Sequence, residues 1–311
     1  MRDAFIHTLE ELARHDPRIV LMTGDLGFGV FNRYREELPG QFVNAGVAEQ
    51  NMTGMAAGMA MSGKCVFTYS IANFPVLRCL EQIRNDICYH NADVKVVAVG
   101  GGMSYGSLGP SHHATEDLAV MRALPNLLVV APGDPVETRL AVKALVEHKG
   151  PAYLRLGRAG EPVVHQSEPA FELGKAITVR EGDDITLVST GGQLYDTVAA
   201  AAVLAEEGVQ ARVISMHTLK PLDTEAVLAA ARETGAIFTV EEHSIIGGLG
   251  SAVAEVLMEA DQRPQFFGRI GLRDCFTSIC GDQAYLRAQY RIDTAGILET
   301  VRGGRAGQLS G

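Results

Sequence analysis

The sequence lacks tryptophan, and aromatic side chains make up 6% of its 311 residues. It also lacks an apolar run that approaches the length of a membrane span, which is about 20 residues. Basic residues are outnumbered by acidic ones, 27 against 37, and the formal net charge is −10. A surface for nucleic acid or for an anionic membrane is therefore not expected, whereas a local basic pocket for a phosphate is compatible with this balance.

Cysteine is too sparse and too irregularly spaced for a disulfide frame or a zinc site. The count is odd, and no C-x-x-C pair occurs among Cys65, Cys79, Cys88, Cys275 and Cys280. Most of these residues lie in apolar surroundings, so reduced, buried thiols are predicted, as is usual in the cytoplasm. Residues 1–16 have apolar side chains at helical spacing, which predicts an amphipathic helix rather than a signal peptide. The predicted location is therefore cytoplasmic, with no membrane contact.

What the sequence does contain is a regular alternation of β-branched runs and helical patterns. In the first half, strands are predicted at 19–23, 65–69, 94–99, 127–131 and 152–156, and helices at 47–62, 74–91 and 134–148. In the second half, strands are predicted at 185–190, 211–215 and 236–242, and helices at 194–207, at 250–260 and at the end of 284–303. Such alternation is typical of parallel sheets that are covered on both faces by helices.

The predicted fold class is α/β, with two consecutive open, mainly parallel-sheet domains. A cluster of glycine and proline at 157–169 marks the change from one unit to the next. We place the domains at 1–160 and 175–311, with a linker at 161–174. Ligands of open parallel sheets gather at the carboxyl ends of the strands, so functional residues are expected in the loops that follow them. These loops are 24–29, 44–50, 70–74, 100–117 and 157–160.

Glu49 lies in one of these loops, within FVNAGVAEQN, where a helix rich in small residues is predicted to begin. Two interpretations are open. An acid in a first helical turn is favoured by the helix dipole and can be a simple cap. Alternatively, Glu49 is a catalytic acid held in an apolar, water-poor place. The triple glycine at 100–102 does not open a helix with G-x-G-x-x-G spacing, so a dinucleotide site is not favoured.

The combination of motifs is more specific than any one of them. The motifs are GDLG (24–27), GVAEQN (46–51), Y-S…F…E-Q-I-R (69–84), GPSHH (109–113), L-P-N…V-V-A-P-G-D (124–134), YLRLGR (153–158) and EEHSIIGGLGS (241–251). In this order and at this spacing they resemble the transketolase family, specifically its pyrimidine-binding domain followed by its C-terminal domain. The resemblance covers nearly the whole chain. It implies that the first domain carries the catalytic residues and that the second serves dimer contacts and stability.

The resemblance implies a role for Glu49 at thiamine diphosphate. Glu49 matches the family glutamate that hydrogen-bonds N1′ of the cofactor's aminopyrimidine ring, the contact through which the cofactor is activated. Phe74 matches the aromatic side chain that lies against this ring, with Tyr69 as the alternative. A core position is the competing interpretation for both aromatic residues.

The resemblance also implies three substrate contacts. His112 matches the histidine beside the reacting oxygens, which is suited to proton transfer or oxyanion stabilisation. Arg33 and Arg158 match two arginines that hold the substrate phosphate, a task that suits a planar guanidinium. Two positions depart from the family. Leu108 stands where an acid usually contacts a substrate hydroxyl, and Gly100 stands where a phosphate-contacting histidine is common. The resemblance therefore does not decide whether this chain shares the family's usual preference for 2-hydroxyaldehyde phosphates.

A complete transketolase has an upstream domain whose G-D-G…N motif holds Mg²⁺ and the diphosphate, and no G-D-G occurs here. The resemblance therefore implies one subunit of a split enzyme, with thiamine diphosphate bridging this chain and a partner N-terminal subunit that carries the metal. The expected enzyme is an α2β2 transferase that moves a two-carbon ketol unit between sugars. The β subunit of a 2-oxo acid dehydrogenase, a relative of deoxyxylulose phosphate synthase, and a catalytically silent scaffold subunit stay open as alternatives.

Overall fold

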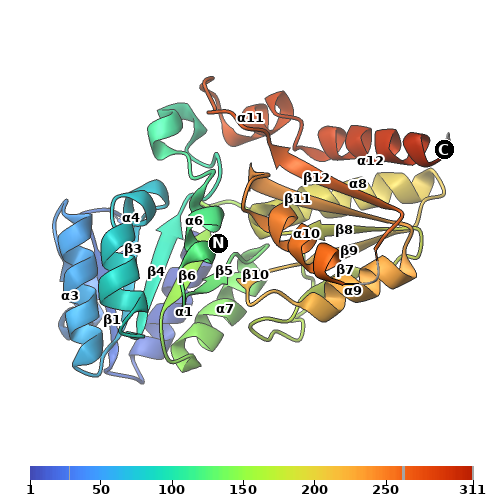
Figure 1. The fold of residues 1–311 in the computed structure, drawn as a ribbon. Coiled ribbons are helices and arrows are strands. Elements are labelled where there is room, and N and C mark those ends of the chain that lie inside the picture. The colour runs from blue at the N-terminus through green and yellow to red at the C-terminus, as the bar shows by residue number, and fades with distance from the viewer. Residues whose placement is uncertain (28, 261–262, 310–311) are drawn as a thin grey trace.

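Two α/β domains lie side by side in the computed structural model, which describes residues 1–27, 29–260 and 263–309 (Figure 1). The first domain is built on a seven-stranded sheet and the second on a five-stranded sheet. Residues 157–176, between the two, contain no helix or strand. The predicted fold class, two mainly parallel α/β units, is confirmed.

The first sheet is parallel except at one edge. Its order is β10-β5-β6-β4-β3-β1-β2. The strands are β1 (Ile19–Thr23), β2 (Phe42–Asn44), β3 (Cys65–Ile71), β4 (Val94–Val99), β5 (Leu128–Val130), β6 (Ala152–Leu156) and β10 (Thr218–Lys220). Strand β10 comes from the second half of the chain and pairs antiparallel with β5. The sequence does not predict β2 or β10, because each has three residues and lies at an edge of the sheet.

Helices cover both faces of the first sheet. They are α1 (Arg2–Ala13), α2 (Asn32–Glu37), α3 (Glu49–Met61), α4 (Asn73–Leu77), α5 (Leu80–Gln82), α6 (Asp117–Ala123) and α7 (Pro135–Glu147), with short turns η1 (Pro39–Gln41), η3 (Gly106–Leu108) and η4 (Pro110–His112). On one face, Met52 of α3 packs with Met22 of β1 in a core that continues into the second domain. On the other face, Phe5 of α1 packs with Phe67 of β3.

The stretch predicted as helical at 74–91 is helical over most of its length, but it is interrupted at residues 78–79. The segment forms α4, α5 and the π-helix η2 (Ile83–Cys88). Cys79, between α4 and α5, has φ −109° and ψ 14°, outside the α-helical region, and its side chain is fully buried. Packing of this thiol into the core therefore overrides the helical pattern of the local sequence.

The second sheet has the order β12-β11-β8-β9-β7. Its strands are β7 (Ile177–Arg180), β8 (Ile185–Ser189), β9 (Ala211–Ser215), β11 (Ala236–Ser244) and β12 (Phe266–Leu272). Its helices are η5 (Gly191–Gln193), α8 (Leu194–Glu206), α9 (Thr224–Glu233), α10 (Leu249–Glu259), α11 (Gln283–Gln289) and α12 (Thr294–Leu309). Strand β8 has β9 as its neighbour on one side and β11 on the other, so the strand order reverses at β8. The ligand-binding crevice typical of open parallel sheets would therefore lie between the carboxyl ends of β8 and β11.

All five cysteines are free thiols, but their burial differs. Cys65, Cys79 and Cys88 are buried, whereas Cys275 and Cys280 are exposed. The predicted burial is wrong for the last two, because residues 273–282 form a surface loop without a helix or strand. Within the described ranges, no helix combines the length and the apolar character needed to cross a membrane.

Candidate functional site

Glu49 begins helix α3 at the carboxyl edge of the first sheet, and it is 4% exposed. Strands β1 and β2 end beside it, and a Cβ placed on Gly24 would lie 3.7 Å from Glu49 Cγ. Glu49 Oε2 accepts a hydrogen bond from Nη1 of Arg78 at 2.9 Å. The carboxylate is therefore turned toward another side chain across the edge of the sheet, which a purely capping role at the helix start does not require.

Arg78 connects Glu49 with two other residues of the predicted site. Its Cζ lies 4.7 Å from the centroid of the Phe74 ring. The Phe74 ring in turn meets the imidazole of His112 edge-on, with the centroids 5.2 Å apart. Glu49, Phe74 and His112 therefore form one continuous group. The sequence interpretation does not single out Arg78; its position four residues after Phe74, one helical turn, is the signal that could have identified it.

The loop at 109–113 holds His112 partly exposed at the end of this group. Asn73 Nδ2 donates to the backbone oxygen of Ser111 at 3.1 Å, and the Ser111 hydroxyl lies 3.0 Å from Nδ1 of His112. The neighbouring His113 is buried, and its Nδ1 is hydrogen-bonded to the hydroxyl of Thr277 in the second domain. Burial lowers the pKa of His113. His112 is therefore free to meet a ligand, whereas His113 anchors the loop.

Tyr69 lies on the other face of the sheet. It is 3% exposed and packs against Phe5 and Phe31, with ring centroids 6.1 and 4.8 Å apart. These rings belong to the core on the α1 side, whereas α3 packs on the opposite side. Of the two aromatic residues named from the sequence, Phe74 is the one that the structure brings to Glu49.

The two arginines predicted for the substrate have different surroundings. Arg33 has an exposed side chain whose Nε lies 2.8 Å from Glu10 Oε1 and 3.2 Å from Glu37 Oε1. Arg158 is exposed, and its Cζ lies 5.3 Å from the centroid of the Tyr105 ring. Arg33 is thus engaged by two carboxylates, while Arg158 rests on an aromatic face and is able to meet an anion.

Tyr105 also explains one departure from the family. Gly100 has φ 83°, and a Cβ at this position would lie 2.1 Å from the Tyr105 ring. The ring of Tyr105 therefore fills the space that a histidine side chain at position 100 would need. The other departure, Leu108, is 53% exposed in the turn η3, where it presents an apolar surface.

A cavity of about 510 Å³ opens between the domains beside the His112 loop. The first domain contributes Asn73, Pro110 and His113 to its lining, and the second contributes Arg273 and Phe276. Because Asn73 and Pro110 also flank His112, the cavity adjoins the group of Glu49, Phe74 and His112. It is large enough for a small polar ligand.

The chemistry at this edge fits the aminopyrimidine part of thiamine diphosphate. Glu49 offers a buried carboxyl that can share a proton with a ring nitrogen, and Phe74 offers a partly exposed aromatic face. Gly24 leaves room beside the carboxyl. In the part of the chain that the structure describes, no three His, Cys, Asp or Glu side chains are grouped so that they could hold a metal ion.

Comparison with known proteins agrees with the predicted resemblance. The sequence matches the family "Transketolase, pyrimidine binding domain" over residues 1–161 and "Transketolase, C-terminal domain" over residues 174–297. It is 44% identical to one subunit of the apulose-4-phosphate transketolase of Phocaeicola vulgatus over 302 residues, 96% of each chain. It is 38% identical to the SqwH subunit of the 6-deoxy-6-sulfo-D-fructose transketolase of Clostridium sp. over 302 residues, 97% of this chain and 93% of that one.

A solved structure is also similar over nearly the whole length. It is described as a split gene transketolase, inactive beta4 tetramer, and it has a TM-score of 0.89 at 40% identity over 97% of both chains. The chain therefore belongs to the transketolase family of transferases, and it corresponds over nearly its whole length to the β chain of a split transketolase.

Proposed function

We propose that this chain supplies the pyrimidine side of a thiamine diphosphate site and that a partner N-terminal subunit holds the diphosphate and Mg²⁺. The assembled α2β2 enzyme transfers a two-carbon ketol unit between sugars in the cytoplasm. When bound, the cofactor supplies a nucleophilic carbon that can attack a ketose carbonyl and hold the electron pair of the broken C–C bond. The observation that supports the proposal most directly is the continuous contact of Glu49, Arg78, Phe74 and His112.

Each residue of this group has a distinct task. The Glu49 carboxyl holds or shares a proton at the pyrimidine nitrogen, where its burial keeps water from competing. Phe74 orients the ring through its face, and Arg78 fixes the direction of the Glu49 carboxylate. His112 moves a proton at a substrate oxygen, or donates to that oxygen as negative charge develops there.

Dependence on a partner is supported by the solved relative, whose β chains are described as an inactive beta4 tetramer. We propose that this chain behaves in the same way and is inactive without its partner. Affinity purification from the native cytoplasm, followed by mass spectrometry, tests this directly. A partner that carries G-D-G…N, together with ketol transfer that requires thiamine diphosphate and Mg²⁺, is the expected result. Lipoyl-bearing companions would instead identify a 2-oxo acid dehydrogenase, and a fully active chain without a partner would contradict the shared site.

The substrate is a ketose with an anionic group at one end. The relatives are named for apulose 4-phosphate and for 6-deoxy-6-sulfo-D-fructose, and phosphate and sulfonate are both anions. The apolar side chain of Leu108 cannot accept a hydrogen bond from a substrate hydroxyl, so selectivity must come from the anion and from the shape of the sugar. Arg158 and Arg33 are the proposed anion contacts.

Replacing Arg158 with methionine is expected to raise KM for the anionic sugar by about tenfold, because a charge-assisted hydrogen bond to the substrate is lost. Arg33→Met is the matched comparison, and its effect is expected to be smaller since Glu10 and Glu37 already neutralise this guanidinium. Steady-state kinetics of the assembled enzyme measure both. Equal KM values for the wild type and the Arg158 variant would remove Arg158 from the site.

A further inference from the structure

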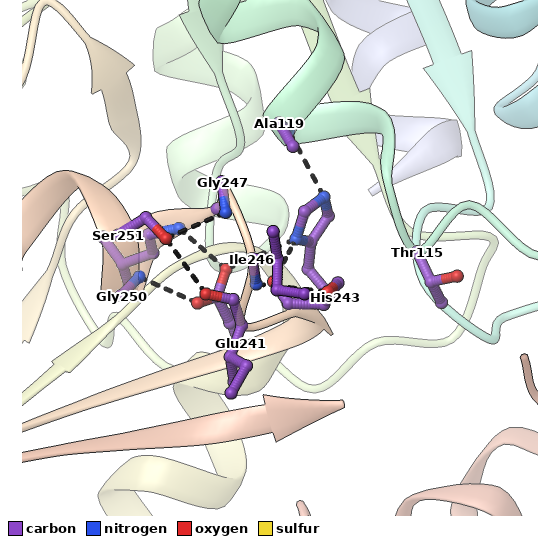
Figure 2. A network of polar contacts seen from close by, with 12 residues as sticks. Thr115, Ala119, Glu241, His243, Ile246, Gly247, Gly250 and Ser251 are labelled. Atoms are coloured by element: carbon purple, nitrogen blue, oxygen red, sulfur yellow. Dashed lines mark hydrogen bonds and ion pairs between the residues drawn. The ribbon is translucent and has the colours of Figure 1, made fainter. Parts of the chain in front are cut away.

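The Glu-Glu-His segment of β11 lies where the two domains meet, and its residues face different neighbours. Glu241 accepts hydrogen bonds from the backbone nitrogens of Leu249 and Gly250, at 2.7 and 2.8 Å, and so holds the start of α10 (Figure 2). Burial raises the pKa of Glu241 to about 7. Both hydrogen bonds stay within the second domain, so through them Glu241 stabilises the start of α10.

Glu242, the next residue, contacts the first domain. Its Oε1 accepts a hydrogen bond from the backbone nitrogen of Met103 at 2.7 Å. Gly102, with φ 67°, makes this approach possible, because a Cβ there would lie 2.6 Å from the Glu242 side chain. Arg287 and Gln283 of α11 hold the carboxylate from the other side, with Arg287 Nη2 at 2.5 Å and Gln283 Nε2 at 2.9 Å from Oε2. Glu242 is thus a buried carboxylate whose charge is paired with Arg287 and whose orientation is fixed by these hydrogen bonds.

The carboxyl end of β11 also binds the part of the chain that follows His112. The backbone nitrogen of Ser244 donates to the carbonyl of Thr115 at 2.8 Å. His243, buried with its pKa lowered by that burial, accepts from the backbone nitrogen of Ala119 at 3.3 Å (Figure 2). Both bonds tie the chain just after His112 to the second domain.

Arg155 of β6 donates hydrogen bonds both to the His112 segment and to strand β11. Its Nη2 donates to the carbonyls of Ala114 and Glu242, at 2.9 and 3.0 Å. Gly102 and Ala114 are also joined by a backbone bridge. Residues 102–115 therefore form a closed loop whose two ends are fastened to the carboxyl end of β11, and His112 lies within this loop.

We propose that Glu242 is a positioning residue for His112. Glu242 lies at the crevice between β8 and β11, where an open parallel sheet would ordinarily bind a ligand. Here the carboxylate of Glu242 instead holds the loop at 102–115. Gln283 strengthens the same contact, because its amide also lies 3.1 Å from the hydroxyl of Ser104. The proposal deepens the proposed function and rests on it for the role of His112, but the fastening of the loop can be measured independently.

Hydrogen–deuterium exchange of the full chain is the first test, since it needs neither partner nor catalysis. Glu242→Gln leaves one acceptor oxygen, so the side chain can no longer accept from both Met103 and Arg287, and exchange of the amides in 102–114 is expected to accelerate by about tenfold. Glu241→Gln is the matched control, and it is expected to accelerate exchange at 249–250 while leaving 102–114 unchanged. Gln283→Ala, a milder change in α11, keeps the test available where Glu242→Gln does not fold. Unchanged exchange at 102–114 in both Glu242→Gln and Gln283→Ala overturns the proposal.

Kinetics of the assembled enzyme then distinguish positioning from stability. A misplaced His112 is expected to raise KM as well as lower kcat, because this residue both contacts the substrate and acts in the reaction. A loss of folded enzyme lowers the apparent kcat but leaves KM unchanged. Faster loop exchange with an unchanged KM would overturn the positioning role. Absence of any ketol transfer by the wild type would contradict the proposed function and leave the exchange result standing.

Discussion

Replacing Glu49 with glutamine is expected to lower kcat of the assembled enzyme by about 10³-fold, since a positioned acid or base typically contributes 10²–10⁴-fold. Glutamine has nearly the same size and can still accept a hydrogen bond from Arg78, so the start of α3 should keep its packing. It cannot hold a transferable proton at the pyrimidine nitrogen. The measurement is kcat at saturating thiamine diphosphate and donor sugar. Circular dichroism checks that the variant remains folded, which suits a chain without tryptophan.

Glu225→Gln is the matched control for this experiment. Glu225 is an exposed acid in the first turn of α9, so it shares with Glu49 the favourable interaction with a helix dipole. This control is expected to retain full activity. If Glu49→Gln is also fully active in the assembled complex, the proposed mechanism is wrong, and a cap in a catalytically silent subunit becomes the better interpretation of Glu49.

The central strands could be predicted from the sequence because they are buried along their whole length. Ile19–Thr23 and Val94–Val99 have the predicted bounds, and every residue in them is buried. β12 could not be predicted, because Gly268 and Arg269 interrupt its apolar run and its first residues are only partly buried. An edge strand of this kind is determined by pairing with its neighbour, which the local sequence does not contain.

The site could be predicted in its residue types but not in its connections. Motifs indicate Glu49 and His112 as candidates, whereas the choice between Phe74 and Tyr69 depends on the direction of side chains. Alternation along β3 could have decided it, because Tyr69 shares a face with the core residue Phe67 and so points toward α1. The spacing of Arg78 from Phe74 can be seen in the sequence, but its hydrogen bond to the distant Glu49 follows only from the folded arrangement.

The buried pair of Arg155 and Asp117 carries the largest expected effect on stability. Arg155→Met is expected to lower the free energy of unfolding by about 3–5 kcal/mol, since it leaves a buried carboxylate without its counter-charge. Arg155 Nε lies 2.8 Å from Asp117 Oδ2, and both side chains are at most 5% exposed. The same guanidinium bonds carbonyls of both domains, at Ala114 and Glu242, so the loss falls on the junction that holds the His112 loop. Urea unfolding followed by circular dichroism measures it.

Two further variants make this prediction specific. Arg155→Met combined with Asp117→Asn removes both charges and leaves the asparagine oxygen able to accept from the Tyr153 hydroxyl, which now donates to Asp117 at 2.6 Å. The double variant is expected to recover a large part of the lost stability, because the unpaired charge rather than the lost pair is the costly element. Arg139→Met, which breaks an exposed pair with Glu168, should change stability by less than about 1 kcal/mol. A similarly small loss for Arg155→Met would show that the junction does not depend on this pair, and the second domain would then hold the His112 loop through Glu242 and Ser244 instead.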